Sequence, residues 1–466
     1  MARKLHRELN NRHIQLIAIG GAIGTGLFLG SGQTISLTGP SLLFTYMIIG
    51  VVLFAFMRAL GELLLSNTRF NSFVDIANEY LGPFGGFVIG WTYWLCWIVS
   101  SMSDLTAMGQ YFAFWYPQVP NWITVLFIVL ILISFNLLGA RLFGELEFWF
   151  SIIKVVTIIA MVIVGLVLIF FSFKTHYGHA SFTNLISHGG MFPGGTFGFL
   201  MSFQIAVYSF IGIELIGVTA GETKDPEKTL PKAINNVPIR ILLFYIGGLL
   251  VIMSVIPWND NSSPFVKLFT LIGVPFAAGV VNFVVLTAAA SATNSGIYSN
   301  SRILFGLSQQ GLGPKVLNKT NSHGVPYLSM LVSSIALLIA ALLNYIFPNA
   351  IQLFIYVTTL STVLFLVVWA MIIVAYLMYL KKHPEAHKNS KFKLIGGKPI
   401  AYIILAFFFF VFILLFFSDE TRAAIYISPF WFIFLFFFYK KYKTNAEKLA
   451  YEQRQNDSGH FRYDNQ

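Results

Sequence analysis

Long apolar segments separated by short polar connections run through almost the whole chain. Twelve of these segments contain the roughly 20 residues that a helix needs to cross a bilayer. They lie near residues 14–37, 41–65, 84–114, 122–139, 149–172, 197–220, 236–257, 273–299, 327–346, 351–380, 399–417 and 424–440. Glycine and proline mark the connections, as at Gly39-Pro40 and Gly82-Pro83. The pattern predicts an all-α polytopic membrane protein with 12 transmembrane helices and no sizeable soluble domain.

Charged residues are scarce and unevenly distributed along the chain. They make up 11% of it, whereas soluble proteins contain roughly 25%. Most basic residues of the loops lie on the side of the N-terminus: Arg69, Arg141, Lys224, Lys228, Lys232, Arg302, Lys315, Lys319, Lys381, Lys382, Lys388, Lys391, Lys393 and Lys398. Positive loops face the cytoplasm, so we expect both termini there and the protein in the plasma membrane. This topology, with contact to anionic lipid, explains the net charge of +11 without nucleic-acid binding.

Two of the apolar segments contain a break in the helical pattern. Glycines crowd Ile19–Leu27 in the first segment, and Tyr208–Glu214 interrupts the sixth. Glycine weakens a helix, and unwound backbone at membrane depth is tolerated only where it lines a cavity or is buried in protein. One such cluster alone is better explained by close helix packing. Two at corresponding places favour a transporter's substrate site.

The distance between the breaks predicts how the chain is organised. Five spans separate equivalent points, and because five is odd, the second repeat must insert in the opposite orientation. We therefore expect inverted halves at about 13–172 and 197–380, with two further helices appended. The transmembrane domain would cover 13–440, between cytoplasmic tails at 1–12 and 441–466.

Several motifs carry a resemblance to a known family. They are His13–Phe28, Gly39-Pro40 followed by Arg58–Glu62, Phe143–Phe150 leading to Lys154, and Phe210–Glu214 leading to Glu222–Lys228. In order and spacing they resemble the amino-acid permeases of the amino acid–polyamine–organocation superfamily, over residues 9 to about 440. The resemblance implies secondary active transport by alternating access, with broken helices 1 and 6.

Other stretches resemble the group of these permeases that carries D-serine, D-alanine and glycine. These stretches are Gly30–Leu37, Gly90–Trp94 and Asn235–Arg240. The substrate implied is a small neutral amino acid, brought into the cell by proton symport. Permeases for other amino acids such as proline share much of this sequence, so a different amino acid remains the alternative.

The two breaks suit a zwitterion, which carries a carboxylate and an ammonium on adjacent atoms. The half-helix that starts near Thr25-Gly26 offers unpaired N–H groups and a positive dipole end to the carboxylate. Carbonyls at both breaks can accept from the ammonium. The expected substrate-binding residues are Ala22, Ile23, Thr25, Gly26, Tyr208, Phe210, Ile211 and Gly212. In the superfamily an aromatic residue near Tyr208 closes over the substrate, although a core tyrosine is the simpler alternative.

Lys154 is the most informative ionisable residue inside a span. It lies roughly 10 Å beyond the start of its helix, so its long side chain could still reach the interface. The resemblance favours a functional role instead. In proton-coupled relatives this lysine takes the place of a sodium ion, where it would bridge Gly21-Ala22 to the 289–293 region and carry the proton.

The carboxylates within spans allow two interpretations each. Glu214 either bonds the unwound backbone or assists the ammonium and the proton. Asp104 and Ser100 either tune selectivity or join helices by hydrogen bonds. Glu62, one turn after Arg58, is interpreted as mainly structural.

Other function classes are less consistent with the sequence. A proton-independent exchanger would use Lys154 as a fixed cation. A membrane enzyme or a channel is disfavoured, because the nine histidines sit in loops, tails or span ends and no polar rings recur. We expect no catalytic residues, no cofactor, no metal and no obligate protein partner. The expected partners are an amino acid, a proton and membrane lipid.

Overall fold

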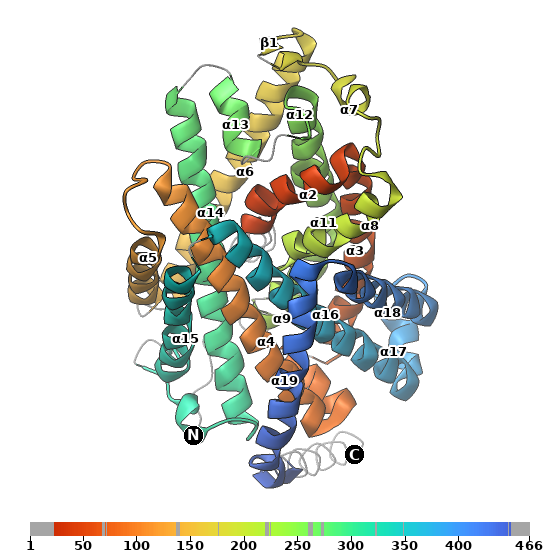
Figure 1. The fold of residues 1–466 in the computed structure, drawn as a ribbon. Helices are drawn as coiled ribbons and strands as arrows, with labels where there is room; N and C mark the ends of the chain where they lie inside the picture. Colours follow the sequence, from red (N-terminus) through yellow and green to blue (C-terminus); the bar gives the residue numbers. More distant parts are fainter. Residues whose placement is uncertain are drawn as a thin grey trace.

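The computed structural model describes residues 23–448, apart from 68–69, 71, 137–139, 176, 220–222, 224, 260–263, 272–274, 322–323, 348 and 446. These residues form a bundle of long helices (Figure 1). The only paired strands described make a short antiparallel hairpin, β1 (Lys174–Thr175) with β2 (Gly178–His179). The expected helical membrane architecture is confirmed, with this hairpin as a small addition.

The first half of the chain folds into the following elements, of which η1 is a wide helical turn. They are η1 (Gly26–Gly30), α2 (Ser31–Thr38), η2 (Gly39–Ser41), α3 (Leu42–Ser66), α4 (Phe73–Ala113), α5 (Asn121–Asn136), α6 (Ala140–Phe170), α7 (Asn184–Ser187), α8 (Gly195–Ala206), η3 (Val207–Phe210) and α9 (Leu215–Thr219).

The second half is equally helical. Its elements are α10 (Pro226–Asn235), α11 (Val237–Arg240), η5 (Ile241–Gly247), α12 (Gly248–Val255), α13 (Pro264–Leu271), α14 (Pro275–Gln309), η6 (Lys315–Asn318), α15 (Tyr327–Ile346), α16 (Ala350–Lys382), α17 (Pro384–Asn389), α18 (Gly397–Leu414), η7 (Leu415–Phe417) and α19 (Asp419–Lys440).

Ten helical stretches among the described residues are long and apolar enough to cross a membrane. The sequence predicted twelve, and the difference has two causes. The stretch Gly26–Ser66 is continuous and covers both of the first two expected spans. Helix α5 has 16 residues, which at 1.5 Å per residue gives roughly 24 Å, less than the roughly 30 Å of a bilayer core.

Helix α4 is the central helix of the bundle and lies between α14 and α16 (Figure 1). It begins with a capping box, in which Ser72 accepts from Val74 and Asp75 accepts from the backbone of Ser72. The helix bends at Gly82, which has a φ of 81° and precedes Pro83. Helix α4 packs most extensively against these two long helices. Its residues are therefore held at the centre of the molecule.

Glu62 joins α3 to the chain that follows α16. Its buried carboxylate accepts from the Tyr376 hydroxyl at 2.8 Å, from the Leu394 backbone N–H at 2.9 Å, and lies 2.6 Å from Nδ1 of His387. The neighbouring Arg58 donates to the carbonyl of Lys393 at 2.7 Å. These contacts fasten the connection between α16 and α18 to the end of α3.

Candidate functional site

The first break is visible from Ile23 onward, and Ala22 lies outside the described residues. Ile23 and Gly24 are not helical, and the helix begins at Gly26. The backbone N–H groups of Leu27 and Phe28 both donate to the Gly24 carbonyl, at 3.2 and 3.3 Å. The start of a helix therefore lies at Thr25-Gly26, where the sequence placed it, with its N–H end facing the break.

The second break interrupts the sixth expected span between η3 and α9. The four residues from Ile211 to Glu214 form a turn rather than a helix. Gly212 has a φ of 98°, a backbone conformation that residues other than glycine adopt only under strain. The Glu214 carboxylate accepts from the Gly212 backbone N–H and from the Tyr93 hydroxyl, each at 3.2 Å. Glu214 is thus bonded to the unwound backbone, as one of its two interpretations required.

The two breaks approach each other closely. A Cβ atom on Gly26 would lie 2.7 Å from the Cα atom of Ser209, so only glycine fits there. Beside this approach lies a cavity of about 20 Å³, which is room for about one water molecule. Its lining residues are Gly24, Thr25, Gly26, Trp97, Ser100, Asp104, Tyr208, Ser209, Ile211 and Ala292. Four segments that are distant in sequence, the two breaks, α4 and α14, therefore share one small space.

Some of the expected binding residues do not line this cavity. The Phe210 ring instead stacks on Tyr245, with ring centroids 4.8 Å apart and planes 10° apart, and it also faces Tyr46. The Tyr245 hydroxyl donates to the Ser209 carbonyl at 2.7 Å. These aromatic contacts hold the backbone of the second break in place, so Phe210 supports its shape through packing.

Asp104 connects the centre of α4 to the first break. The Thr25 hydroxyl donates to its carboxylate across 2.5 Å, and both side chains are buried. A carboxylate is thereby held at the start of the half-helix and at the edge of the cavity. The helix-to-helix hydrogen bond and the place in the cavity wall occur together, although the sequence analysis treated them as alternatives.

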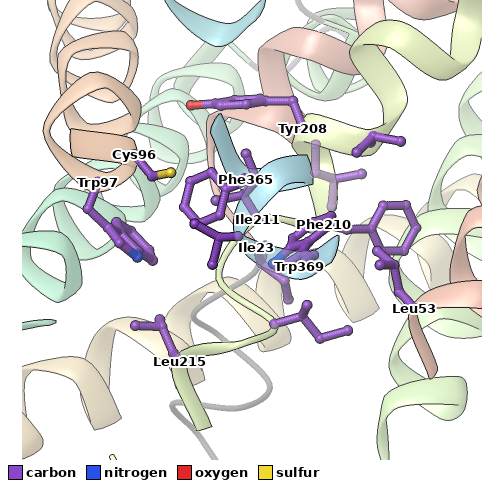
Figure 2. Packing of buried hydrophobic residues seen from close by; sticks show 14 of the residues in the cluster. Ile23, Leu53, Cys96, Trp97, Tyr208, Phe210, Ile211, Leu215, Phe365 and Trp369 are labelled. Carbon is purple, nitrogen blue, oxygen red and sulfur yellow. The ribbon is translucent and has the colours of Figure 1, made fainter. Parts of the chain in front are cut away.

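Tyr208 closes one side of the cavity. Figure 2 shows its ring above Ile23 and Ile211, with the hydroxyl pointing toward the helix that carries Trp97. That hydroxyl lies 3.3 Å from the Ser100 hydroxyl and forms a short hydrogen bond with Ser103. Ser103 lies one turn from Ser100 in the same span, but the sequence does not show that the two serines share Tyr208 as a partner.

Lys154 is completely buried, which excludes the alternative that its side chain reaches the interface. Its ammonium donates to the Ser291 hydroxyl of α14 at 2.8 Å, within the region that the sequence indicated. Ser291 in turn donates to Glu147, with 2.7 Å to each carboxylate oxygen. The ammonium also lies 3.9 Å from Oε1 of Glu147. Gly21, the other expected contact, lies outside the described residues.

Glu147 is a site residue that the sequence analysis missed. It precedes Lys154 by seven residues, which is two turns of helix, so the two side chains share a face of α6. That spacing was the available signal. Among the described residues, no three His, Cys, Asp or Glu side chains form a group that could hold a metal ion.

Comparisons with known proteins cover nearly the whole chain. A family model described as amino acid permease matches residues 13–449. The D-serine/D-alanine/glycine transporter of Escherichia coli K12 is 51% identical over 437 residues, which are 93% of each chain. The amino-acid permease AapA of Bacillus subtilis is 49% identical over 450 residues, 96% of this chain and 97% of its own. An uncharacterized transporter of the same bacterium, YdgF, is 51% identical over 446 residues.

Proposed function

The chain belongs to the amino acid permease family and transports amino acids, and from this premise we propose that it takes up D-serine, D-alanine and glycine by proton symport. The family that the motifs around the first break indicated is thereby confirmed. The substrate proposal is supported by the transporter of that name, which is 51% identical over 93% of both chains. The cavity between the two breaks is the observation that carries the proposal.

We place this site in a twelve-span carrier with inverted halves at about 13–172 and 197–380. Two structural features support the arrangement. The breaks in the first and sixth expected spans lie against each other, as a two-fold repeat requires. The hairpin, α7 and α13 lie at one end of the bundle, and the C-terminal end of α19 lies at the other (Figure 1). With Lys440 in the last turn of α19, the latter end would face the cytoplasm.

The remaining features of the topology belong to the same proposal. Residues 1–12 and 441–466 would be cytoplasmic tails of a plasma-membrane protein. Basic residues of the connection between α16 and α18, among them Lys388, Lys391 and Lys393, are exposed and would meet anionic lipid.

The zwitterion would bind with its carboxylate toward the N–H groups at Thr25-Gly26. Its ammonium would then lie toward the carbonyls of the second break, from Tyr208 to Ile211, and toward those at Ala22-Ile23. A carbonyl oxygen has two lone pairs, so a carbonyl that already accepts a backbone bond can accept from the ammonium as well. In this closed arrangement the cavity of about 20 Å³ has room for about one water molecule, so it must widen before an amino acid binds.

Asp104 and Ser100 would set the selectivity of this site. The Asp104 carboxylate lies in the cavity wall and is fixed by Thr25. A fixed negative charge at the wall favours a substrate with an ammonium and disfavours a second negative charge. Glu214 would hold the second break in its binding shape through its bond to Gly212.

Alternating access would require Tyr208 to swing away from α4. In this structure the hydroxyl of Tyr208 is bonded to serines of α4 and the cavity is small, which is the arrangement of a closed gate. Its release would enlarge the space between the breaks and open it to one face of the membrane.

Lys154 would carry the coupled proton. Its complete burial beside Ser291 and Glu147 supports the role, because ionisable side chains inside membrane spans are rare and mark proton relays. The competing proposal is exchange without protons, in which Lys154 stays charged throughout.

The test is uptake of labelled D-alanine into proteoliposomes that contain the purified full-length protein. We expect accumulation with an imposed inward pH gradient, its loss with a protonophore, and competition by D-serine and glycine. A panel of L- and D-amino acids that includes proline defines the substrate. If uptake does not depend on the pH gradient but requires amino acid inside the vesicles, the mechanism is exchange and not symport. If proline competes and glycine does not, the substrate proposal is wrong and proline is the better candidate.

A further inference from the structure

Lys154, Ser291 and Glu147 form an uninterrupted chain of hydrogen bonds. The ammonium donates to the serine hydroxyl at 2.8 Å, and that hydroxyl donates its own hydrogen to the carboxylate at 2.7 Å. All three side chains are completely buried. Each link thus points the same way, from the ammonium to the carboxylate.

The chain has a direction relative to the membrane. In the proposed topology α6 enters from the cytoplasm at Ala140, so Glu147 is seven residues closer to the cytoplasm than Lys154. At 1.5 Å per residue the two Cα positions differ by roughly 10 Å along the helix. The hydrogen bonds therefore lead from Lys154 toward the cytoplasmic side.

Few other charged groups of the described residues face this chain. Asp104 on α4 is close enough to Lys154 to interact with it electrostatically, and α6 itself also carries Glu145. Among the described elements, α5, α12, η5 and α14 make the most extensive contacts with α6. In α5, α12 and η5 the described residues contain no Asp, Glu, Lys, Arg or His. Helix α14 contains only Arg302, which is eleven residues from Ser291 and bonds to Ser301.

We propose that Glu147 accepts, through the hydroxyl of Ser291, the proton that Lys154 releases toward the cytoplasm. The N–H bond of Lys154 breaks as that proton binds the serine oxygen, and the serine's original proton passes to a Glu147 oxygen. An ammonium and a carboxylate become an amine and a carboxylic acid, so no uncompensated charge is left in the membrane. The inference rests on the proposed proton symport and adds the step in which the proton is released toward the cytoplasm.

Ser291→Ala tests the relay with little disturbance, because it removes the hydroxyl and keeps both charged groups. Ser291→Thr keeps a hydroxyl and is the rescue variant. Glu147→Gln keeps an acceptor oxygen but cannot take up the proton. Ser295→Ala is the matched control, since Ser295 is a buried serine one turn along α14 whose hydroxyl has no hydrogen bond among the described residues.

Two transport modes are measured in the same proteoliposomes with labelled D-alanine. One is accumulation driven by an imposed pH gradient, with a pH-sensitive dye inside to record proton entry. The other is exchange against internal unlabelled D-alanine at equal pH, which needs no proton release. Size-exclusion profiles of the purified variants establish that each is folded.

We expect Ser291→Ala and Glu147→Gln to lower gradient-driven accumulation by about tenfold or more while exchange stays within about threefold of wild type. Ser291→Thr and Ser295→Ala should accumulate D-alanine normally. Normal accumulation by Ser291→Ala or Glu147→Gln would overturn the relay, and so would an equal loss of both transport modes. If the wild type itself ignores the pH gradient, the proposed symport fails and the relay fails with it. If Lys154→Ala abolishes coupling while Glu147→Gln retains it, only the relay is wrong.

Discussion

The Thr25 hydroxyl donates a 2.5 Å hydrogen bond to the Asp104 carboxylate, which ties the start of the first half-helix to the centre of α4. One partner belongs to a segment that is not helical on its N-terminal side, and the other to the most extensively packed helix of the bundle. The bond therefore transfers the rigidity of α4 to the place where the substrate carboxylate is proposed to bind. It also places a carboxyl group at the cavity wall.

Replacing Asp104 by Asn should weaken binding of the zwitterion. The amide keeps an acceptor for Thr25 but removes the charge that we propose to favour the ammonium. A hydrogen bond or contact to a charged group contributes about 1.5–3 kcal/mol, so we expect KM for glycine to rise by about 10- to 100-fold. Initial rates of uptake over a range of glycine concentrations measure this.

Thr25→Ser is the control for the Asp104 substitution, because it keeps the hydroxyl that bonds the carboxylate. It should leave KM within about threefold of wild type. If Asp104→Asn also transports glycine with an unchanged KM, Asp104 contributes only to helix packing and not to selectivity.

Gly26→Ala should block transport through a backbone clash. The added Cβ would lie 2.7 Å from the Cα atom and 3.0 Å from the backbone N of Ser209, and neither atom can rotate away. Such overpacking costs about 1–3 kcal/mol and would displace one break from the other. We expect D-alanine uptake to fall to about a tenth or less. Gly306→Ala on α14 is the matched control, because a Cβ there has no neighbour within 4 Å.

Gly212→Leu tests the second break independently of the first. The backbone of Gly212 has a φ of 98°, and a branched residue in that region carries strain of about 1–3 kcal/mol. We expect the variant to insert in the membrane at the wild-type level and to lose uptake. Normal D-alanine transport by a well-expressed Gly212→Leu protein would remove the second break from the site.

The sequence predicted the places of the two breaks well, and the physical reason is local. Gly24, Gly26 and Gly212 each weaken the helix in which they lie, so the interruption can be recognised without knowing the neighbours. The burial of Lys154 was not predictable in this way, because its expected position allowed the side chain to reach the interface, and the packing of α14 on α6 decides against that. The two-part shape of α4 was missed: its bend follows the positive φ of Gly82, although that residue was assigned only to a connection.

Features that depend on packing between distant segments could not be derived from the sequence. Ser291 meets Glu147 across 144 positions of sequence, and this pairing is set by how α14 lies on α6. The Ser103 bond to Tyr208 likewise depends on the angle between η3 and α4. The stacking of the Phe210 ring on Tyr245 is not identified by any local pattern, while the carbonyl of Phe210 stays among those proposed to meet the ammonium.

Tyr208→Phe should destabilise the closed gate while keeping the aromatic ring. The substitution removes the hydrogen bonds to Ser100 and Ser103. A buried hydrogen bond is worth about 1 kcal/mol, and the closed state that it stabilises has too small a cavity for an amino acid, so we expect KM for D-alanine to fall by about fivefold. Uptake kinetics provide the measurement, and Tyr345→Phe is the control, because Tyr345 is 67% exposed on α15. An unchanged KM would mean that the hydroxyl only fills space against α4.

Glu62→Ala should lower the stability of the protein without any direct effect on the substrate. The substitution removes the acceptor of the Tyr376 hydroxyl and the Leu394 backbone N–H, which are both buried. Each unsatisfied buried donor costs about 1–3 kcal/mol, so the loss should reach several kcal/mol and a clear decrease of Tm. Thermal unfolding of the purified protein in detergent measures it. Asp419→Asn is the control, because its ion pair with Arg422 is exposed and such pairs contribute little.

Lys154→Ala should separate proton coupling from substrate recognition. The substitution removes the donor to Ser291 and leaves Glu147 as a buried carboxylate without its cation. Leaving one member of a buried ion pair costs about 3–5 kcal/mol, so the Lys154→Ala, Glu147→Ala double variant should recover stability that the single variant loses.

Neither variant should accumulate D-alanine in response to a pH gradient, because both lack the group that binds the proton. Dye-recorded proton entry alongside labelled uptake distinguishes the cases. A Lys154→Ala protein that still couples uptake to the pH gradient would transfer the proton role to another residue, with Glu214 and Asp104 as the buried carboxylates nearest the two breaks.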